Sequence, residues 1–188
     1  MKRTNYVAAM VFMGASVLIA CEKEHIDDQK PVIRVIEPVE DEVVTPGNAL
    51  HFDVMFSDNV ALASYKVSIH GAFDGHAHSH NSTTNGLKDD GITTRVATDS
   101  VAFEKTWLES DFIALGEPPI TGKKQATVKH LHLVIPETVN RTVNGKAEEM
   151  PLKEGHYHFI VYCSDESGQE SFVAQEIFIS YDPHEHLH

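Results

Sequence analysis

Short segments in which apolar and polar residues alternate recur through this chain between residues 31 and 181. The clearest is GHYHFIVYCSD, residues 155–165, in which every second side chain from Tyr157 to Cys163 is apolar. Successive side chains of a β-strand point to opposite faces, so this alternation predicts a strand with one face in a core and the other in water. Related segments are ALHFDVMF (49–56), LASYKVSIH (62–70), TVKHLHLVIP (127–136) and SFVAQEIFIS (171–180). Together they predict an all-β domain.

Several short, half-buried strands favour an antiparallel β-sandwich. PVIRVIEP (31–38) and EGHYHFIVYCSDESGQES (154–171) resemble the opening and the closing of bacterial Ig-like domains, with Gln169 where the closing motif usually has Asn. IHGAFDGHAHSH (69–80) followed by GHYHF resembles an uncharacterised family of Bacteroidetes lipoproteins with an Ig-like domain. The resemblance implies an Ig-like antiparallel β-sandwich over residues 31–181, with a long insertion between the C and E strands.

The insertion, roughly residues 71–126, carries no clear strand alternation of its own. Its first part is rich in Asn, Thr and Gly and is typical of a loop. Its second part, residues 97–119, contains apolar residues that fit either a strand or a short helix. A second polar excursion, residues 137–155, predicts a hairpin turning at VNGK.

The amino terminus predicts a secretory signal over residues 1–20, since Lys2 and Arg3 precede an apolar stretch too short to span a membrane. LIAC at its end resembles a bacterial lipobox, which would make Cys21 a lipidated amino terminus; the alternative is an ordinary signal peptide with an incidental cysteine. Residues 21–30 predict an acidic tether, similar to the surface-export signal of Bacteroidetes lipoproteins, and residues 182–188 a His-rich tail. We therefore expect an outer-membrane lipoprotein facing the periplasm or the cell surface, with its lipid anchor in the membrane.

The net charge of −13, with histidines neutral, disfavours nucleic acid as a partner and favours cations. With Cys21 lipidated, Cys163 would be the remaining thiol, so no internal disulfide is expected. Cys163 shares the apolar face of its segment and is interpreted as a core residue. Asp58 and Asp165 follow predicted strands and are interpreted as turn caps in preference to Ca²⁺ ligands.

Thirteen histidines are far more than a chain of 188 residues usually carries, and their positions are informative. The alternation places five of them on polar strand faces, namely His70, His130, His132, His156 and His158. Strands C and F of an Ig-like sandwich are antiparallel neighbours, so the end of LASYKVSIH and the start of GHYHF should meet at one pole. The loop with His76, His78 and His80 leaves from that pole.

This convergence predicts a metal site, because imidazoles brought close together are the ligands that zinc prefers. The expected ligands are His70, His76, His78 and His158. Further candidates are His80, His156, and Asp74, the last as a ligand or as an acceptor that orients an imidazole. His130 and His132 lie on the predicted E strand, which normally belongs to the other sheet, so they either join this site, form a second one or are solvated. Imidazole and carboxylate donors suit Zn²⁺, with Ni²⁺ or Cu²⁺ as alternatives, and do not suit Ca²⁺.

Two functions follow from these patterns. The first is a metal-binding lipoprotein that sequesters, delivers or senses a transition metal. The second is a cell-surface adhesion or accessory module for a protein or glycan partner, in which the histidines are structural or interface residues. An enzyme is not expected, because a metal-dependent hydrolase needs a general base that no motif places here.

Overall fold

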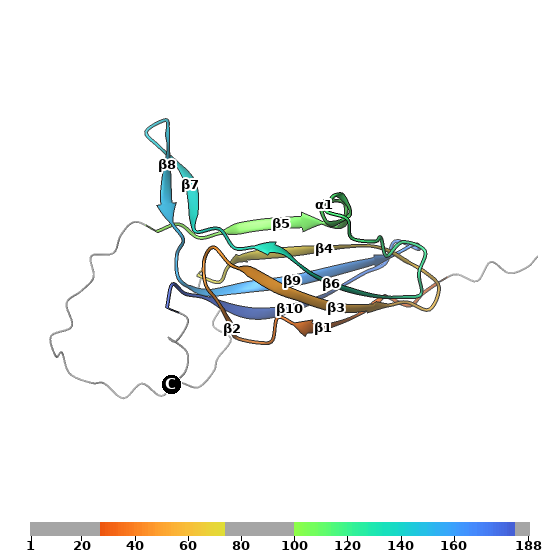
Figure 1. The fold of residues 1–188 in the computed structure, drawn as a ribbon. Helices are drawn as coiled ribbons and strands as arrows, with labels where there is room; N and C mark the ends of the chain where they lie inside the picture. The colour runs from red at the N-terminus through yellow and green to blue at the C-terminus, as the bar shows by residue number, and fades with distance from the viewer. Residues whose placement is uncertain (1–26, 74–99, 183–188) are drawn as a thin grey trace, which may run out of the picture.

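The computed structural model describes residues 27–73 and 100–182, which form a β-sandwich with one short helix (Figure 1). One sheet has the order β1-β3-β6, formed by Val32–Glu37, Ala49–Ser57 and Gln125–Val134. The other has the order β2-β10-β9-β4-β5, formed by Glu42–Val44, Glu170–Ile179, Gly155–Asp165, Leu62–Gly71 and Glu104–Leu108. No helix in the described ranges is long and apolar enough to cross a membrane.

The strand pairing is that of an Ig-like sandwich, as predicted. Neighbouring strands are antiparallel except β2, which runs parallel to β10 at the edge of the larger sheet. β4 and β9, the predicted C and F strands, are antiparallel neighbours in the larger sheet. The start of β9 therefore lies beside the end of β4.

The core lies between the two sheets and confirms the alternation for β3, β4 and β9. Their inward side chains are nearly all completely buried: Leu50, Phe52, Val54, Phe56, Tyr65, Val67, Ile69, Tyr157, Phe159, Val161 and Cys163. On β4 and β9 the intervening residues face outward and are half-buried or exposed, including His70, His156 and His158. The histidines of the larger sheet are therefore available to solvent.

The second part of the insertion forms both structures that its sequence allows. β5 adds an edge strand beside β4 and ends at Leu108, and helix α1, Glu109–Ala114, follows at once. The carboxylate of Asp111 accepts a hydrogen bond of 2.8 Å from the Leu108 backbone N–H, which fixes the first turn of the helix. Trp107 and Phe112 are buried, so the strand and the helix both close the core.

The predicted hairpin is present as β7, Thr138–Val143, and β8, Lys146–Pro151. Its two-residue turn consists of Asn144 and Gly145, both with positive φ, at 51° and 79°. Asn-Gly is the preferred pair for a turn of this kind, because both central residues must adopt left-handed conformations. The hairpin stands apart from the two main sheets at one end of the sandwich (Figure 1).

The predicted faces of β6 are wrong in its middle. His130 is 7% exposed and faces the core, whereas Leu131 is 55% exposed. Phe52 pairs with His130 but Leu50 pairs with Leu133, so β6 carries one extra residue between these two pairs. Such a β-bulge resets the alternation, which is why a strict period of two assigned the histidine and the leucine to the wrong faces.

Candidate metal centre

A row of four polar side chains crosses the outer face of the larger sheet near the end of β4. The strand register places Glu104 opposite His70, His70 opposite His158, and His158 opposite Glu176. Directly opposed residues on one face of a sheet have Cβ atoms about 4.5–5.5 Å apart, so their side chains interact. Four strands therefore bring two imidazoles and two carboxylates into one line.

The two imidazoles in the middle of the row are in direct contact. Nε2 of His70 lies 3.3 Å from Nδ1 of His158, and the rings meet edge to face with centroids 5.2 Å apart. Two nitrogen ligands of a tetrahedral zinc ion, each at 2.0–2.1 Å, lie about 3.3–3.4 Å apart. The separation of these nitrogens thus fits both a shared proton and a shared metal ion.

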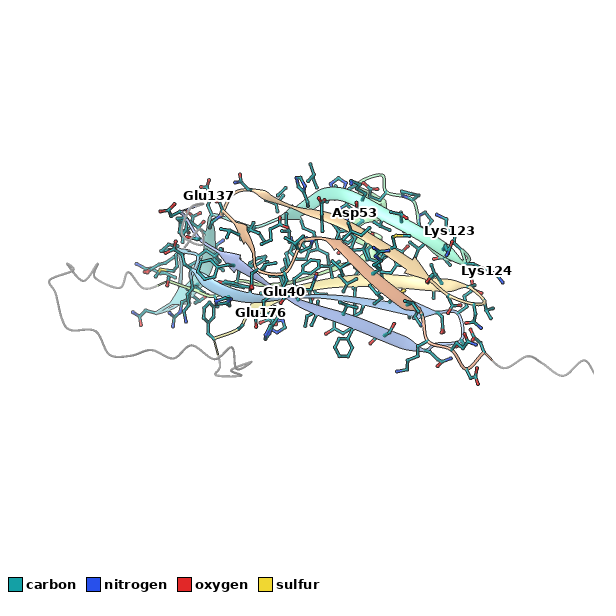
Figure 2. All side chains as sticks on the ribbon, turned by 90° about the horizontal axis from the view of Figure 1, so that it is seen from below. Glu40, Asp53, Lys123, Lys124, Glu137 and Glu176 are labelled. Carbon is teal, nitrogen blue, oxygen red and sulfur yellow. The ribbon has the colours of Figure 1, made fainter. Side chains whose placement is uncertain are left out.

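Glu176 lies on the other side of His158 and contacts both histidines of β9. Its Oε2 is 3.3 Å from Nδ1 of His156, and its Oε1 is 3.9 Å from Nε2 of His158. The distance of 3.9 Å is too long for a hydrogen bond, but the negative charge of Glu176 favours a proton on Nε2 of His158, with the lone pair of Nδ1 directed at His70. The backbone N–H of Glu176 donates to Glu40, and the two glutamates are labelled side by side in Figure 2. Glu176 is therefore positioned to orient His158.

Asp41, just before β2, extends the cluster toward the sheet edge. Asp41, His156 and Glu176 each offer one ligand atom, and these three atoms lie within 4.8 Å of one another. The Asp41 backbone N–H donates to the carbonyl oxygen of Glu176 at 2.9 Å, which holds this residue beside β10. We call Asp41, His70, His156, His158 and Glu176 the histidine cluster. Its donors are the nitrogen and oxygen atoms that zinc accepts.

His130 and His132 do not join the histidine cluster, because β6 belongs to the other sheet. The His130 ring is stacked between Phe52 and Phe112, at centroid distances of 4.7 and 4.4 Å. Nε2 of His132 lies 3.0 Å from a carboxylate oxygen of Glu117. The sequence predicted that both histidines would bind a metal or lie in solvent. This prediction is wrong for His130, which is a core residue.

Burial, followed by the nearby His132, lowers the pKa of His130 from 6.5 to about 4. Between pH 6.5 and about 4, His130 is therefore protonated in the unfolded chain and neutral in the folded chain. Its stabilising contribution is complete above pH 6.5 and is lost as the pH falls toward 4, by about 3 kcal/mol. We expect His130→Phe to remove this part of the acid destabilisation, measured as the free energy of unfolding in urea at about pH 7 and about pH 4.

The matched control for that measurement is His51→Phe, since the His51 side chain is 61% exposed and contacts Glu37 only at 3.5 Å. It should leave the pH dependence of the wild type unchanged. Equal acid sensitivity in the wild type and the His130→Phe variant would show that His130 does not titrate abnormally.

The remaining predicted ligands lie outside the described residues. These are Asp74, His76, His78 and His80, and the predicted lipidation site Cys21 is also outside. Cys163 is described and is buried in the core. Burial, with smaller effects from nearby carboxylates, raises the pKa of its thiol to about 12. Cys163 is therefore a protonated core residue at neutral pH and does not offer a thiolate to a metal.

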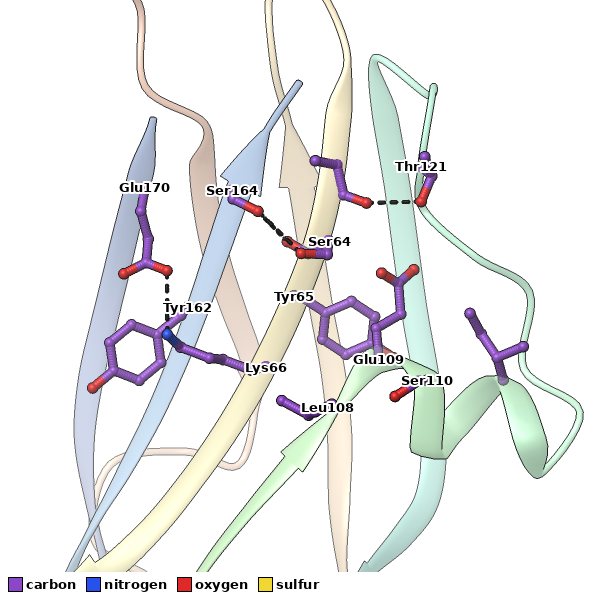
Figure 3. A pocket seen from close by; sticks show the side chains of 12 residues that line it. Ser64, Tyr65, Lys66, Leu108, Glu109, Ser110, Thr121, Tyr162, Ser164 and Glu170 are labelled. Carbon is purple, nitrogen blue, oxygen red and sulfur yellow. Dashed lines mark hydrogen bonds and ion pairs between the residues drawn. The ribbon is translucent and has the colours of Figure 1, made fainter. Parts of the chain in front are cut away.

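The opposite end of the same sheet face has a different character, which Figure 3 shows. There Nζ of Lys66 lies 3.2 Å from Glu170 and 4.4 Å from the centroid of the Tyr162 ring. The hydroxyls of Ser64 and Ser164 are 3.0 Å apart. Glu170 is thus on the same strand and the same face as Glu176, but it is neutralised by a lysine and has no imidazole beside it among the described residues.

Sequence reasoning missed two members of the histidine cluster, Asp41 and Glu176. Glu176 was within reach, because β9 and β10 form a hairpin around the turn at residues 166–169. Counting six residues along each strand from the pair Ser164 and Glu170, which lies beside the turn, places Glu176 opposite His158. Asp41 carried no such signal, since β2 pairs with β10 in parallel and the two are far apart in the chain.

A comparison with family models finds a match to the family described as "Domain of unknown function (DUF4625)", over residues 19–180. The match includes every residue of the histidine cluster and both sheets. A search of curated proteins finds no match to the chain.

Proposed function

The chain belongs to the family described as Domain of unknown function (DUF4625), and we propose that its sandwich binds a transition-metal ion, zinc, at the histidine cluster in order to sequester, deliver or sense the metal. The observation that carries this proposal is the 3.3 Å separation of Nε2 of His70 and Nδ1 of His158 on adjacent strands. Neighbouring strand positions are rigid, so these nitrogens keep the spacing of two zinc ligands.

The proton that the two imidazoles share is the group that the ion would replace. Each nitrogen then donates a lone pair to the metal, and other donors or water complete the coordination. Imidazole with carboxylate suits Zn²⁺, and also Ni²⁺ or Cu²⁺. Glu176 supports the ion indirectly by holding His158, and Asp41 and His156 supply further donors at the sheet edge. Because the cluster is open to solvent, a metal can enter and leave, as delivery or sensing requires.

We further propose that the protein is anchored at the outer membrane through lipidated Cys21, which rests on the LIAC motif and on the acidic residues after it. The full chain has a formal charge of −13, and removal of residues 1–20 with Lys2 and Arg3 would leave the anchored protein with 13 − 28 = −15, which would concentrate cations near the membrane. The alternative function is a surface-binding module in which His70 and His158 form only a structural hydrogen bond.

Zinc titration of a Glu176→Gln variant tests the proposal. Loss of a carboxylate that orients a ligand histidine typically weakens metal binding about 10–100-fold, and we expect a loss in that range by calorimetry. Glutamine keeps the size of the side chain and its polarity, so the sheet should be preserved.

Glu170→Gln is the matched control, because it removes the same charge from the same face of β10. It should bind zinc as the wild type does. Equal affinity in the wild type, Glu176→Gln and Glu170→Gln would contradict the proposal and leave the surface-binding module as the better explanation.

A further inference from the structure

Three aspartates meet at the end of the sandwich opposite to the histidine cluster. Asp27 begins the first described segment, Asp58 follows β3, and Asp165 ends β9, at the end to which the β9 arrow points in Figure 1. Each offers one carboxylate oxygen, and the three oxygens lie within 4.8 Å of one another. Three segments that are distant in the sequence thus bring their negative charges to one point.

Turn capping accounts for only one oxygen of Asp58 and of Asp165. Oδ1 of Asp58 accepts hydrogen bonds from the backbone N–H groups of Val60 and Ala61, at 2.8 and 2.7 Å. Oδ1 of Asp165 accepts from the Ser167 hydroxyl and the Gln169 N–H, at 2.7 and 2.9 Å. The predicted role as turn caps is therefore real and is performed by Oδ1 in both residues.

The second oxygen of each residue is buried with no hydrogen-bond partner among the described residues. This is so for Oδ2 of Asp58 and Oδ2 of Asp165, and Asp165 as a whole is only 2% exposed. A buried carboxylate oxygen without a partner destabilises the fold, so such atoms are rare in native proteins. Two of them in one cluster indicate that a ligand completes it.

The charges around the three aspartates favour a cation as the missing partner. In the described part of the chain, no Lys, Arg or His nitrogen lies within 4.0 Å of the three carboxylates. Three close carboxylates repel one another unless a cation lies between them.

We propose that Asp27, Asp58 and Asp165 form a Ca²⁺ site. Calcium takes six to eight oxygen ligands at 2.3–2.6 Å in flexible geometry, and three carboxylate oxygens within 4.8 Å of one another can share one such ion. Magnesium demands near-ideal octahedral geometry and usually keeps several waters beside one or two carboxylates, so a group of three carboxylates suits it less well. The trio consists of carboxylates, whereas the histidine cluster also offers imidazoles, so the two sites suit different metals and are independent.

The ion would fasten the start of the domain to two turns. Asp27 is already bound there by Asn59, which donates to its carboxylate at 3.0 Å, and by Gln169, which donates to its carbonyl oxygen at 3.0 Å. The hydroxyl of Ser171 donates to the carbonyl oxygen of Pro31 a few residues later. Calcium at this point would therefore add to the contacts that hold Asp27 against the turns of Asn59 and Gln169.

Thermal unfolding of the full chain tests the site. Metal is first removed with a chelator, and the protein is then heated in buffer, in about 10 mM CaCl₂, in about 10 mM MgCl₂, and in NaCl of equal ionic strength. If the site binds calcium with a dissociation constant of about 0.1–1 mM, as extracellular calcium modules do, CaCl₂ should raise Tm by about 3–8 °C. Magnesium should give a smaller rise, and NaCl should give little change.

Asp165→Asn keeps an oxygen for the turn cap and removes one charge from the trio. It should be at least as stable as the wild type in chelator, because repulsion is relieved, and it should lose the calcium-dependent rise in Tm. Asp58→Asn should behave in the same way and decides the question if the first variant does not fold. Glu166→Gln, an exposed neighbour in the same turn, is the control and should keep the full rise. A wild type that responds equally to CaCl₂ and NaCl, or variants that keep the calcium response, would overturn the proposal.

Discussion

Simultaneous replacement of His70 and His158 by alanine is expected to weaken zinc binding by more than about 100-fold. The loss should exceed the 10–100-fold effect of removing an orienting partner, because this variant removes two ligand nitrogens outright. In the structure these nitrogens are 3.3 Å apart and occupy directly opposed positions of β4 and β9. The measurement is competition between the protein and a chromophoric zinc chelator, which reports affinities too high for direct titration.

The control is His51→Ala, which removes an exposed histidine from the other sheet and should leave zinc affinity unchanged. Both His70 and His158 point outward, so the double variant should keep its fold, as circular dichroism and Tm can verify. A correctly folded double variant with wild-type zinc affinity would place the metal elsewhere in the chain.

The second large effect is expected on stability. Phe112→Ala should lower the free energy of unfolding by about 3–5 kcal/mol, the range observed when a buried aromatic side chain is removed. Phe112 is completely buried, and its ring is stacked on Tyr65 and His130 at centroid distances of 5.6 and 4.4 Å. Urea denaturation measures the change, and Tm should fall by roughly 10 °C for a domain of this size.

Ile113→Ala provides the comparison, since this neighbour on α1 is 43% exposed. Its substitution should cost less than about 1 kcal/mol. Similar losses at the two positions would mean that α1 packs loosely on the sandwich and that Phe112 is not part of its core.

Alternation was sufficient to predict most of the core and the part of the site that depends on neighbouring strands. A strand with one buried face has a specified register, because a shift of one residue would expose its whole apolar set. This is why the sequence alone assigns His70, His156 and His158 to the outer face. An Ig-like order of strands then brings His70 and His158 to the same pole.

The remaining features depend on interactions that a local pattern does not encode. The bulge in β6 adds one residue against β3, and nothing in TVKHLHLVIP marks where the addition occurs. Asp41 reaches the histidine cluster through a parallel pairing between segments that are distant in the chain. Asp58 and Asp165 were correctly interpreted as turn caps, but the burial of their second oxygens emerges only when three segments come together.

The decisive experiment for the zinc site is a crystal structure of the zinc-loaded chain, with anomalous scattering measured at the zinc absorption edge. We expect an anomalous peak between the two strands, about 2.0–2.1 Å from both Nε2 of His70 and Nδ1 of His158. A structure that has zinc only at other positions, with the His70 and His158 nitrogens still hydrogen-bonded to each other, would contradict the proposed function.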